Sequence, residues 1–292
     1  MDFTEDIVEV GQLARRLGDP SLRLLDASWY HALEKRDAGA EFEAAHIPGA
    51  AFASLDALAD PDATLPHSIP AVAHFDRVIG RLGISRASHV VVYDTSGFRS
   101  APRLWWLFRW AGHERASVLN GGLPAWRASG LPVARGVSAR APETFVAQGG
   151  RMPVCDAATV AAALHDRGTK ILDVRPRGRF LGTAPEPWPG LRCGHIPGSV
   201  SLPLDRLTER SSGRLLSPEV LRSVFDGAGV HAGSRVIATC GSGVAAAGLV
   251  LALKQIGIEA TLYDGSWAEW GAREDLPLSR PEPSPATSRI TP

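Results

Sequence analysis

The chain has 292 residues, of which 45% are apolar and 21% charged, and its 31 Lys and Arg residues are balanced by 31 Asp and Glu residues. This length corresponds to two ordinary domains or one large domain, and the apolar content excludes wholesale disorder. The absence of a basic excess argues against nucleic acid as a partner. No apolar run approaches the roughly 18 residues of a membrane span. Because the acidic N-terminus also lacks the layout of a secretion signal, the sequence predicts a soluble cytoplasmic protein.

The cysteine content limits the kinds of site that the chain can form. Cys155, Cys193 and Cys240 are too few and too scattered for a disulfide framework or a structural zinc site. The sequence also shows no metal-spaced His/Cys cluster and no glycine-rich nucleotide loop, so we expect neither a metal nor an organic cofactor. A cysteine with a special role should therefore act as a free thiol.

Short apolar runs alternate with helical stretches along the chain. In chain order, the runs rich in Val, Ile and Leu predict buried strands over 22–27, 89–94, 116–121, 170–174, 235–240 and 260–265. Between them, helices are predicted over 68–83, 100–112, 217–229 and 243–257. This alternation predicts an α/β fold with a mainly parallel sheet and helices on both faces. Ligands of such sheets bind just beyond the carboxyl ends of the strands.

The second half of the chain repeats the first. The sequence HIPG begins at His46 and again at His195, 149 residues later, and Asp94 aligns with Cys240 at an offset of 146 residues. The segments VLNGGLPAW and LYDGSWAEW follow in the same order at nearly the same offset. Three landmarks at one spacing indicate two copies of a single domain.

The repeat suggests how the copies divide their roles. We place the domains at 1–138 and 156–278, joined by a linker over 139–155 and followed by a disordered tail over 279–292. Both copies carry the HIPG turn, so its histidines should hold the turn rather than catalyse. Because the first copy has Asp94 where the second has a cysteine, we expect the first domain to act as a scaffold and cleft wall.

Cys240 occupies the most informative position in the sequence. It ends a predicted strand, and the loop Cys-Gly-Ser-Gly-Val-Ala that it begins opens directly into a helix. The glycines let backbone N–H groups turn inward, and together with the helix N-terminus these groups favour thiolate over thiol. The loop therefore predicts a nucleophile, although a small buried apolar role is the alternative. A cysteine phosphatase is disfavoured, because the arginine it needs six residues later is Ala246 here.

The doubled LLD…HIPG…YDGSW pattern, with a cysteine in the second copy only, resembles the two-domain rhodanese sulfurtransferases over roughly residues 5–278. Its CGSGV loop is most similar to that of the 3-mercaptopyruvate sulfurtransferases. The resemblance implies two tandem rhodanese-like domains. It also implies transfer of sulfur from 3-mercaptopyruvate through a Cys240 persulfide, with release of pyruvate, to an acceptor such as cyanide, a small thiol or thioredoxin.

The resemblance also implies the catalytic residues around the thiol. Ser242, His67 and Asp56 match a family relay that would supply a proton to the departing enolate. Because His67 and Asp56 belong to the first domain, the site should lie between the domains. The remaining loop residues expected to contact the donor are Gly241, Gly243 and Val244.

A donor carboxylate calls for a guanidinium, and Arg179 matches a substrate-binding arginine of the family. The family's second arginine is replaced here by Trp188. We therefore expect Arg192, four residues later, to reach the same carboxylate.

Two other functions remain open at this stage. One is a thiosulfate:cyanide sulfurtransferase that uses the same persulfide. The family members that prefer thiosulfate carry a basic pair where this chain has Gly241 and Ser242, which disfavours this alternative. The other is a non-catalytic sulfur-carrier or binding module, which would not need a proton relay.

Overall fold

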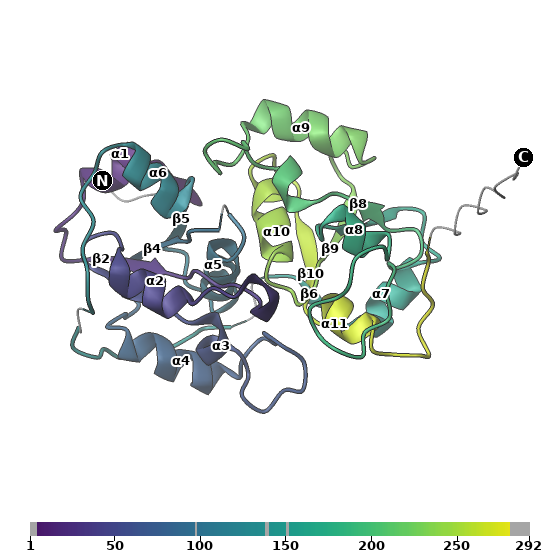
Figure 1. Ribbon diagram of the computed structural model, residues 1–292, viewed down its shortest axis with the longest axis horizontal. Helices are drawn as coiled ribbons and strands as arrows, with labels where there is room; N and C mark the ends of the chain where they lie inside the picture. Colours follow the sequence, from purple (N-terminus) through teal and green to yellow (C-terminus); the bar gives the residue numbers. More distant parts are fainter. Residues whose placement is uncertain (1–4, 97, 138–139, 150–151, 281–292) are drawn as a thin grey trace, which may run out of the picture.

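The computed structural model describes residues 5–96, 98–137, 140–149 and 152–280, which form two α/β domains side by side (Figure 1). Each domain has a sheet of five parallel strands, in the order β1-β5-β4-β2-β3 in the first domain and β6-β10-β9-β7-β8 in the second. The two orders correspond strand by strand. The structure thereby confirms the predicted α/β fold and its duplication.

The first domain is built from residues up to Ala128. Its strands are β1 (Ile7–Val8), β2 (Leu22–Asp26), β3 (Ala50–Phe52), β4 (His89–Tyr93) and β5 (Ala116–Leu119). Its helices are α1 (Val10–Ala14), η1 (Ala32–Glu34), α2 (Ala38–Ala44), α3 (Leu55–Leu58), α4 (Val72–Arg81), α5 (Ala101–Trp110) and α6 (Gly122–Ala128).

The second domain repeats this plan. Its strands are β6 (Val154–Cys155), β7 (Thr169–Asp173), β8 (Val200–Ser201), β9 (Arg235–Thr239) and β10 (Ala260–Tyr263). Its helices are α7 (Ala157–Ala163), α8 (Arg177–Phe180), η2 (Leu204–Arg206), α9 (Pro218–Gly227), α10 (Ala246–Lys254) and α11 (Ser266–Trp270).

All six predicted strands are present, whereas two helices begin later than predicted. Helix α4 begins at Val72 rather than residue 68, because Pro70 disfavours helical geometry in the residue before it. Helix α10 begins at Ala246 rather than at residue 243, because Gly243 has a left-handed φ of 77° and therefore still belongs to the loop.

Helices α5 and α10 pack against each other between the two sheets and join the domains (Figure 1). Each follows the equivalent strand of its domain, β4 or β9. Their side chains belong to one buried apolar cluster that extends through both domains and includes Trp105, Trp106, Leu249 and Leu253. The tryptophans of α5 therefore fill the domain interface, and the two domains share a core.

The connection between the domains follows the surface of the first one. Within the predicted linker, Glu143 donates its N–H to Gly80, and Phe145 is only 3% exposed. Val154 and Cys155 at its end already form β6 of the second sheet. Of the predicted tail, Ser279 pairs with His195, and residues 281–292 lie outside the described residues.

Within the described ranges, no helix is long and apolar enough to cross a membrane. The same residues contain no cluster of three or more His, Cys, Asp or Glu side chains that could hold a metal ion.

One buried aspartate differs in its pairing between the two copies. Asp173, at the end of β7, receives hydrogen bonds from Nε and Nη2 of Arg175 at 2.9 and 2.7 Å. The equivalent Asp26, at the end of β2, is 1% exposed and accepts the N–H of Ser28 instead. Burial, with a contribution from the charge of Asp94, raises the pKa of Asp26 to about 6. The first domain therefore keeps an aspartate whose charged form is poorly stabilised.

We expect Asp26→Asn to stabilise the protein at pH 7.5 by about 1–3 kcal/mol, because it removes this buried charge. The folded-state pKa lies above the unfolded one, so the destabilisation is complete above pH 6 and fades as the pH falls toward 4. At pH 4.5 the gain should shrink to about a third. Urea unfolding at both pH values measures it, and an equal gain at both would contradict the assignment.

Candidate active site

The Cys240 loop is held from outside by helix α11. Cys240 follows β9 and is 3% exposed. Its carbonyl oxygen accepts the N–H of Trp267 at 3.0 Å, and that of Gly241 accepts the N–H of Ala268 at 2.8 Å. Since the N–H of a peptide unit points opposite to its carbonyl, the N–H groups of Gly241 and Ser242 are directed away from α11.

Ser266 anchors the same loop through its hydroxyl group. The Oγ accepts the N–H groups of Cys240 and Gly243 at 3.2 and 3.1 Å and donates to the carbonyl of Tyr263 at 2.8 Å. Ser266 is fully buried and has a φ of 48°, a left-handed conformation that costs a non-glycine residue about 1–2 kcal/mol. The equivalent residue of the first domain is Gly122, where a Cβ would lie 2.0 Å from the carbonyl oxygen of Asp94. Only the copy that bears the cysteine therefore has this hydroxyl.

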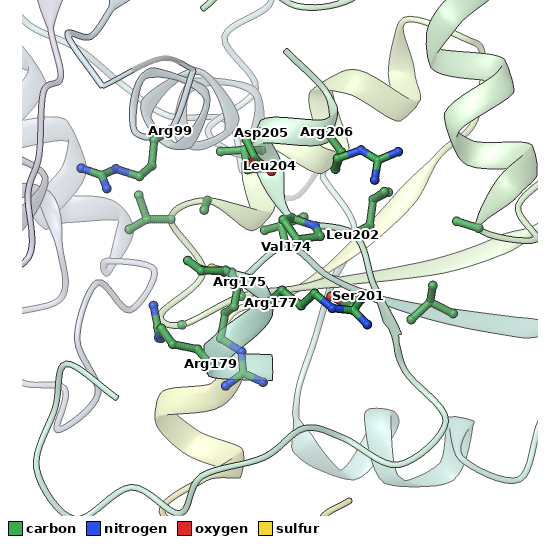
Figure 2. Close-up of a pocket in the computed structure, with 18 of the residues that line it drawn as sticks. Arg99, Val174, Arg175, Arg177, Arg179, Ser201, Leu202, Leu204, Asp205 and Arg206 are labelled. Atoms are coloured by element: carbon green, nitrogen blue, oxygen red, sulfur yellow. The ribbon is translucent and has the colours of Figure 1, made fainter. Parts of the chain in front are cut away.

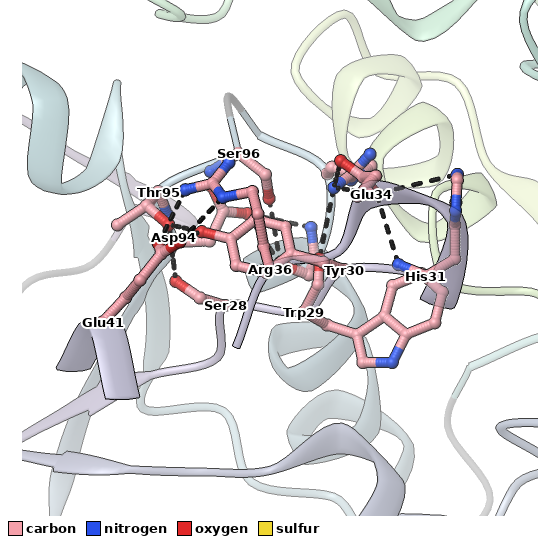
Figure 3. Close-up of polar contacts among 12 residues, drawn as sticks. Ser28, Trp29, Tyr30, His31, Glu34, Arg36, Glu41, Asp94, Thr95 and Ser96 are labelled. Atoms are coloured by element: carbon pink, nitrogen blue, oxygen red, sulfur yellow. Dashed lines mark hydrogen bonds and ion pairs between the residues drawn. The ribbon is translucent and has the colours of Figure 1, made fainter. Parts of the chain in front are cut away.

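The equivalent loop of the first domain, which begins at Asp94, binds a carboxylate through its backbone N–H groups. The Asp94 carboxylate is 2% exposed (Figure 3). It accepts N–H groups at 2.8–3.3 Å from Ser96, Phe98, Ser100 and Ala101. The first domain thus encloses a negative charge in a cradle of backbone N–H groups.

At the 146-residue offset, Ser96 and Phe98 correspond to Ser242 and Val244. Among the described residues, the N–H groups of Ser242 and Val244 have no protein hydrogen-bond partner. The active-loop copy therefore presents similar donors on the side of Cys240, with no carboxylate to fill them. Such donors are suited to a sulfur anion.

The predicted relay is assembled across the domain interface. His67 Nδ1 lies 2.9 Å from Ser242 Oγ, and His67 Nε2 lies 3.0 Å from Asp56 Oδ1. The hydrogen bond from His67 holds the pKa of the Asp56 carboxyl below its usual range. An ionised carboxylate only accepts, so Nε2 donates to Asp56, and when the ring carries no second proton Nδ1 can accept the Ser242 hydroxyl. The geometry therefore allows a proton to pass between Ser242 and His67.

A buried guanidinium holds His67 in place. His67 has a left-handed φ of 58°, and its carbonyl accepts Nη2 of Arg103 at 2.6 Å. The same Nη2 donates to Asp264 Oδ1 at 2.7 Å, and Asp264 Oδ2 accepts the N–H of Ile69 at 2.9 Å. Arg103 belongs to α5, whereas Asp264 follows β10, so this ion pair joins the domains directly behind the relay.

Two tryptophans flank the imidazole. The ring of Trp29 meets the ring of His67 edge to face at 4.5 Å, and its Nε1 donates to Asp56 at 3.1 Å. The ring centroids of Trp188 and His67 are 6.5 Å apart. These rings restrict the motion of His67 and make the surroundings of the relay largely apolar.

Arg179 lies against the cysteine loop but already has a carboxylate partner. Its Nε and Nη2 donate to Glu186 at 3.0 and 2.5 Å, and Glu186 also accepts Arg175 Nη1 at 2.8 Å. A Cβ on Gly241 would lie 2.8 Å from Arg179 Nη2 and 3.2 Å from the Trp188 ring. Glycine at 241 therefore lets both side chains reach the loop. Among the described residues, Arg179 Nη1 has no hydrogen-bond partner, so it is available to a ligand.

The structure does not bring Arg192 to this site. Its guanidinium donates to four backbone carbonyl oxygens at the end of α11 and beyond it, those of Trp270, Gly271, Arg273 and Leu276. It is absent from the residues that line the cavity, whereas Trp188 is among them. With its donors bonded to these carbonyls, Arg192 does not compensate for the arginine that Trp188 replaces.

A cavity of about 810 Å³ opens beside Cys240 between the domains (Figure 2). The first domain contributes Trp29, His31 and Arg99. Arg99 forms an ion pair with Glu34, and Figure 3 shows His31 beside the same carboxylate. The second domain contributes α8, the loop residues Gly241, Ser242 and Val244, and a wall from β8, η2 and α9. The predicted nucleophile, its serine and Arg179 therefore face one shared space.

The two HIPG histidines make matching structural contacts. His46 stacks on Phe42 at 4.1 Å and His195 on Phe180 at 3.9 Å, and each Nδ1 bonds to the carbonyl of that same phenylalanine. These equivalent roles in both copies support a turn function.

Arg103, Asp264, Ser266 and Trp29 were not identified from the sequence. Asp264 and Ser266 lie in the YDGSW segment that marks the repeat, so its polar residues were a usable signal. Arg103 lies in a helix that is otherwise read as apolar, and nothing local indicates its partners.

Comparison with known proteins places this geometry in a family. A model of the Rhodanese-like domain matches residues 9–129 and 156–273. The chain therefore belongs to the rhodanese family of sulfur-transferring enzymes, with two copies of the domain. The crystal structure of SseA from Escherichia coli, described as a 3-mercaptopyruvate sulfotransferase, is similar with a TM-score of 0.82 at 35% identity, covering 90% of this chain and 99% of that one.

Curated relatives include enzymes named for different donors. The chain is 43% identical over 272 residues to human 3-mercaptopyruvate sulfurtransferase, covering 92% of this chain and 89% of the relative. It is 38% identical over 268 residues to the Escherichia coli K12 enzyme of the same name, covering 91% of this chain and 95% of the relative. It is also 42% identical over 259 residues to rat thiosulfate sulfurtransferase, covering 87% and 86%.

We expect Ser266→Ala and Ser266→Gly to lower kcat about equally, by roughly tenfold, because both remove the hydroxyl that anchors the loop. The glycine variant should be more stable than the alanine variant by about 1 kcal/mol, because only glycine relieves the left-handed strain. Steady-state kinetics and urea unfolding measure the two effects. Activity retained in the glycine variant would show that the hydroxyl is dispensable.

Proposed function

We propose that the protein transfers the sulfur of 3-mercaptopyruvate to a thiol or to cyanide through a persulfide on Cys240. The Cys240 thiolate attacks the donor sulfur, an S–S bond forms, and the C–S bond breaks with release of the enolate of pyruvate. The proton of the new persulfide then passes to the enolate carbon by way of Ser242 and His67. Pyruvate leaves, and the persulfide anion remains on the enzyme.

The hydrogen bond between His67 and Ser242, 2.9 Å long and contributed from both domains, is the main support for this donor. A leaving enolate needs a proton, which a hydroxyl backed by an imidazole can supply. Sulfite leaving from thiosulfate needs none. The hydrogen-bonded relay of Ser242, His67 and Asp56 therefore favours 3-mercaptopyruvate as the donor.

The remaining residues support the same chemistry. Arg179 has a free Nη1 and lies against Gly241, where it can bind a donor carboxylate. The N–H groups of Ser242 and Val244 are placed to stabilise the persulfide anion. The site contains a single carboxylate-binding arginine of this kind, because Trp188 holds the neighbouring position. The cytoplasmic location stays a prediction from the N-terminal sequence.

The donor is tested by offering 3-mercaptopyruvate and thiosulfate separately with cyanide and measuring kcat/KM for thiocyanate formation. We expect the higher efficiency with 3-mercaptopyruvate. Cys240→Ser should abolish thiocyanate formation from both donors, and mass spectrometry should then find no added sulfur atom on the protein. The matched variant Cys193→Ser should keep both reactions and the added sulfur. Higher efficiency with thiosulfate would establish the rhodanese alternative, for which the rat relative provides the precedent in name. Inactivity with every small donor would favour a sulfur-carrier role.

The relay predicts a further difference between donors. Ser242→Ala should lower kcat with 3-mercaptopyruvate by about 10²-fold, because the enolate loses its proton source. With thiosulfate the same variant should lose less than about threefold, since no proton transfer is needed. Single-turnover kinetics with each donor separate the two steps. Equal losses would mean that Ser242 acts on the loop and not on the proton.

A further inference from the structure

The cavity beside Cys240 is larger than a three-carbon donor requires. Its volume of about 810 Å³ lies near the upper end of the range for sites that enclose drug-sized ligands. Arg179, Trp188 and Trp29 surround the part next to the relay. The rest extends away from these residues, along β8, η2 and α9.

The wall of this extension is apolar with charged residues at its edge. Val200, Leu202, Leu204, Val224 and Ala228 line it. Figure 2 shows Arg177 and Arg206 toward the side of Ser201 and Leu202, whereas Arg99 and Arg179 lie on the opposite side of the cavity. The cavity thus has a pair of guanidinium groups on each side, and Arg179, proposed to bind the donor carboxylate, is separate from Arg177 and Arg206.

The two pairs differ in how their charges are balanced. Arg99 is paired with Glu34 at 3.0 Å, and Arg179 is paired with Glu186 at 2.5 Å. Within the described part of the chain, the side chains of Arg177 and Arg206 make no ion pair and no hydrogen bond. Asp205 is the single unpaired carboxylate on this wall, so the extension keeps a net positive charge.

We infer that this extension binds the sulfur acceptor, and that the acceptor is a small thiol carrying at least one carboxylate. The inference rests on the proposed persulfide chemistry. A carboxylate would pair with Arg177 or Arg206, and the carbon skeleton would lie on Val200, Leu204 and Val224. This arrangement directs the thiol toward Cys240, at the inner end of the same cavity.

The transfer step balances without any further reactant. The acceptor thiol loses its proton to solvent, and its thiolate attacks the outer sulfur of the Cys240 persulfide. One S–S bond forms on the acceptor as the S–S bond to Cys240 breaks. The acceptor leaves as a persulfide, and the Cys240 thiolate is regenerated with no net oxidation.

The test compares acceptors that differ in charge, at saturating 3-mercaptopyruvate with pyruvate release as the readout. Mercaptosuccinate supplies carboxylates, and 2-mercaptoethanol is the neutral probe. For the double variant Arg177→Gln/Arg206→Gln we expect KM for mercaptosuccinate to rise about tenfold. KM for 2-mercaptoethanol and for the donor should change less than about twofold. Arg222→Gln, on α9 outside the cavity lining, is the matched control and should change none of these values.

Reversing the charge gives a second measurement on the same wall. Arg206→Glu should raise KM for mercaptosuccinate further and lower KM for cysteamine, whose ammonium group it would attract. Equal changes for charged and neutral thiols, or none for mercaptosuccinate, would overturn the acceptor site. An effect on reduced thioredoxin alone would overturn it too and indicate a protein-docking surface instead. A failure of the proposed function is distinguishable, because no donor would then load sulfur onto Cys240 in the unmodified protein.

Discussion

The site depends on one guanidinium buried where the two domains meet. Arg103 is 1% exposed, and its Nη2 donates both to the His67 carbonyl and to the Asp264 carboxylate. Desolvating such a pair offsets most of its Coulomb attraction, so its net contribution to stability is small. Its main consequence is geometric. Arg103 fixes the left-handed backbone of His67 against the second domain, and Asp264 lies directly beneath Gly243 of the cysteine loop.

Duplication places the same loop in both domains with different residues at its start. Both copies turn backbone N–H groups toward the residue that follows the fourth strand of the domain in chain order. In the first copy that residue is Asp94, whose carboxylate bonds to these groups and occupies the cradle permanently. In the second it is Cys240, and Ser266 ties the backbone from outside where the first copy has Gly122. Chemical asymmetry thus arises from a few substitutions on the same backbone plan.

The charges around the cavity are arranged to leave only selected groups available. Arg175 and Arg179 share Glu186, and Arg175 also binds Asp173, so four charges lie close together with no net excess. This neutral cluster positions Arg179 without adding a net positive charge beside the thiol. The uncompensated arginines lie farther out. The Cys240 sulfur therefore has apolar and aromatic surroundings on the side of His67 and positively charged residues on the other side of the cavity.

The sequence by itself determined the α/β class and the duplication, because strand periodicity and repeat spacing are local patterns, and its glycine-bent loop predicts Cys240 as the nucleophile. It also supported His67, Asp56 and Ser242, through resemblance to a family, and the structure brings all three together. It failed for Arg192, because four residues of separation do not say which way a guanidinium points, and here backbone carbonyls at the end of α11 and just beyond it bind the side chain. Only the tertiary structure decided the roles of Arg103, Asp264 and Ser266 and the extent of the cavity. Arg103, its ion pair with Asp264 and the cavity depend on how α5 packs on α10, a contact between segments more than a hundred residues apart that no local pattern encodes. Ser266 acts within the second domain, where its hydroxyl contacts a loop more than twenty residues earlier in the chain.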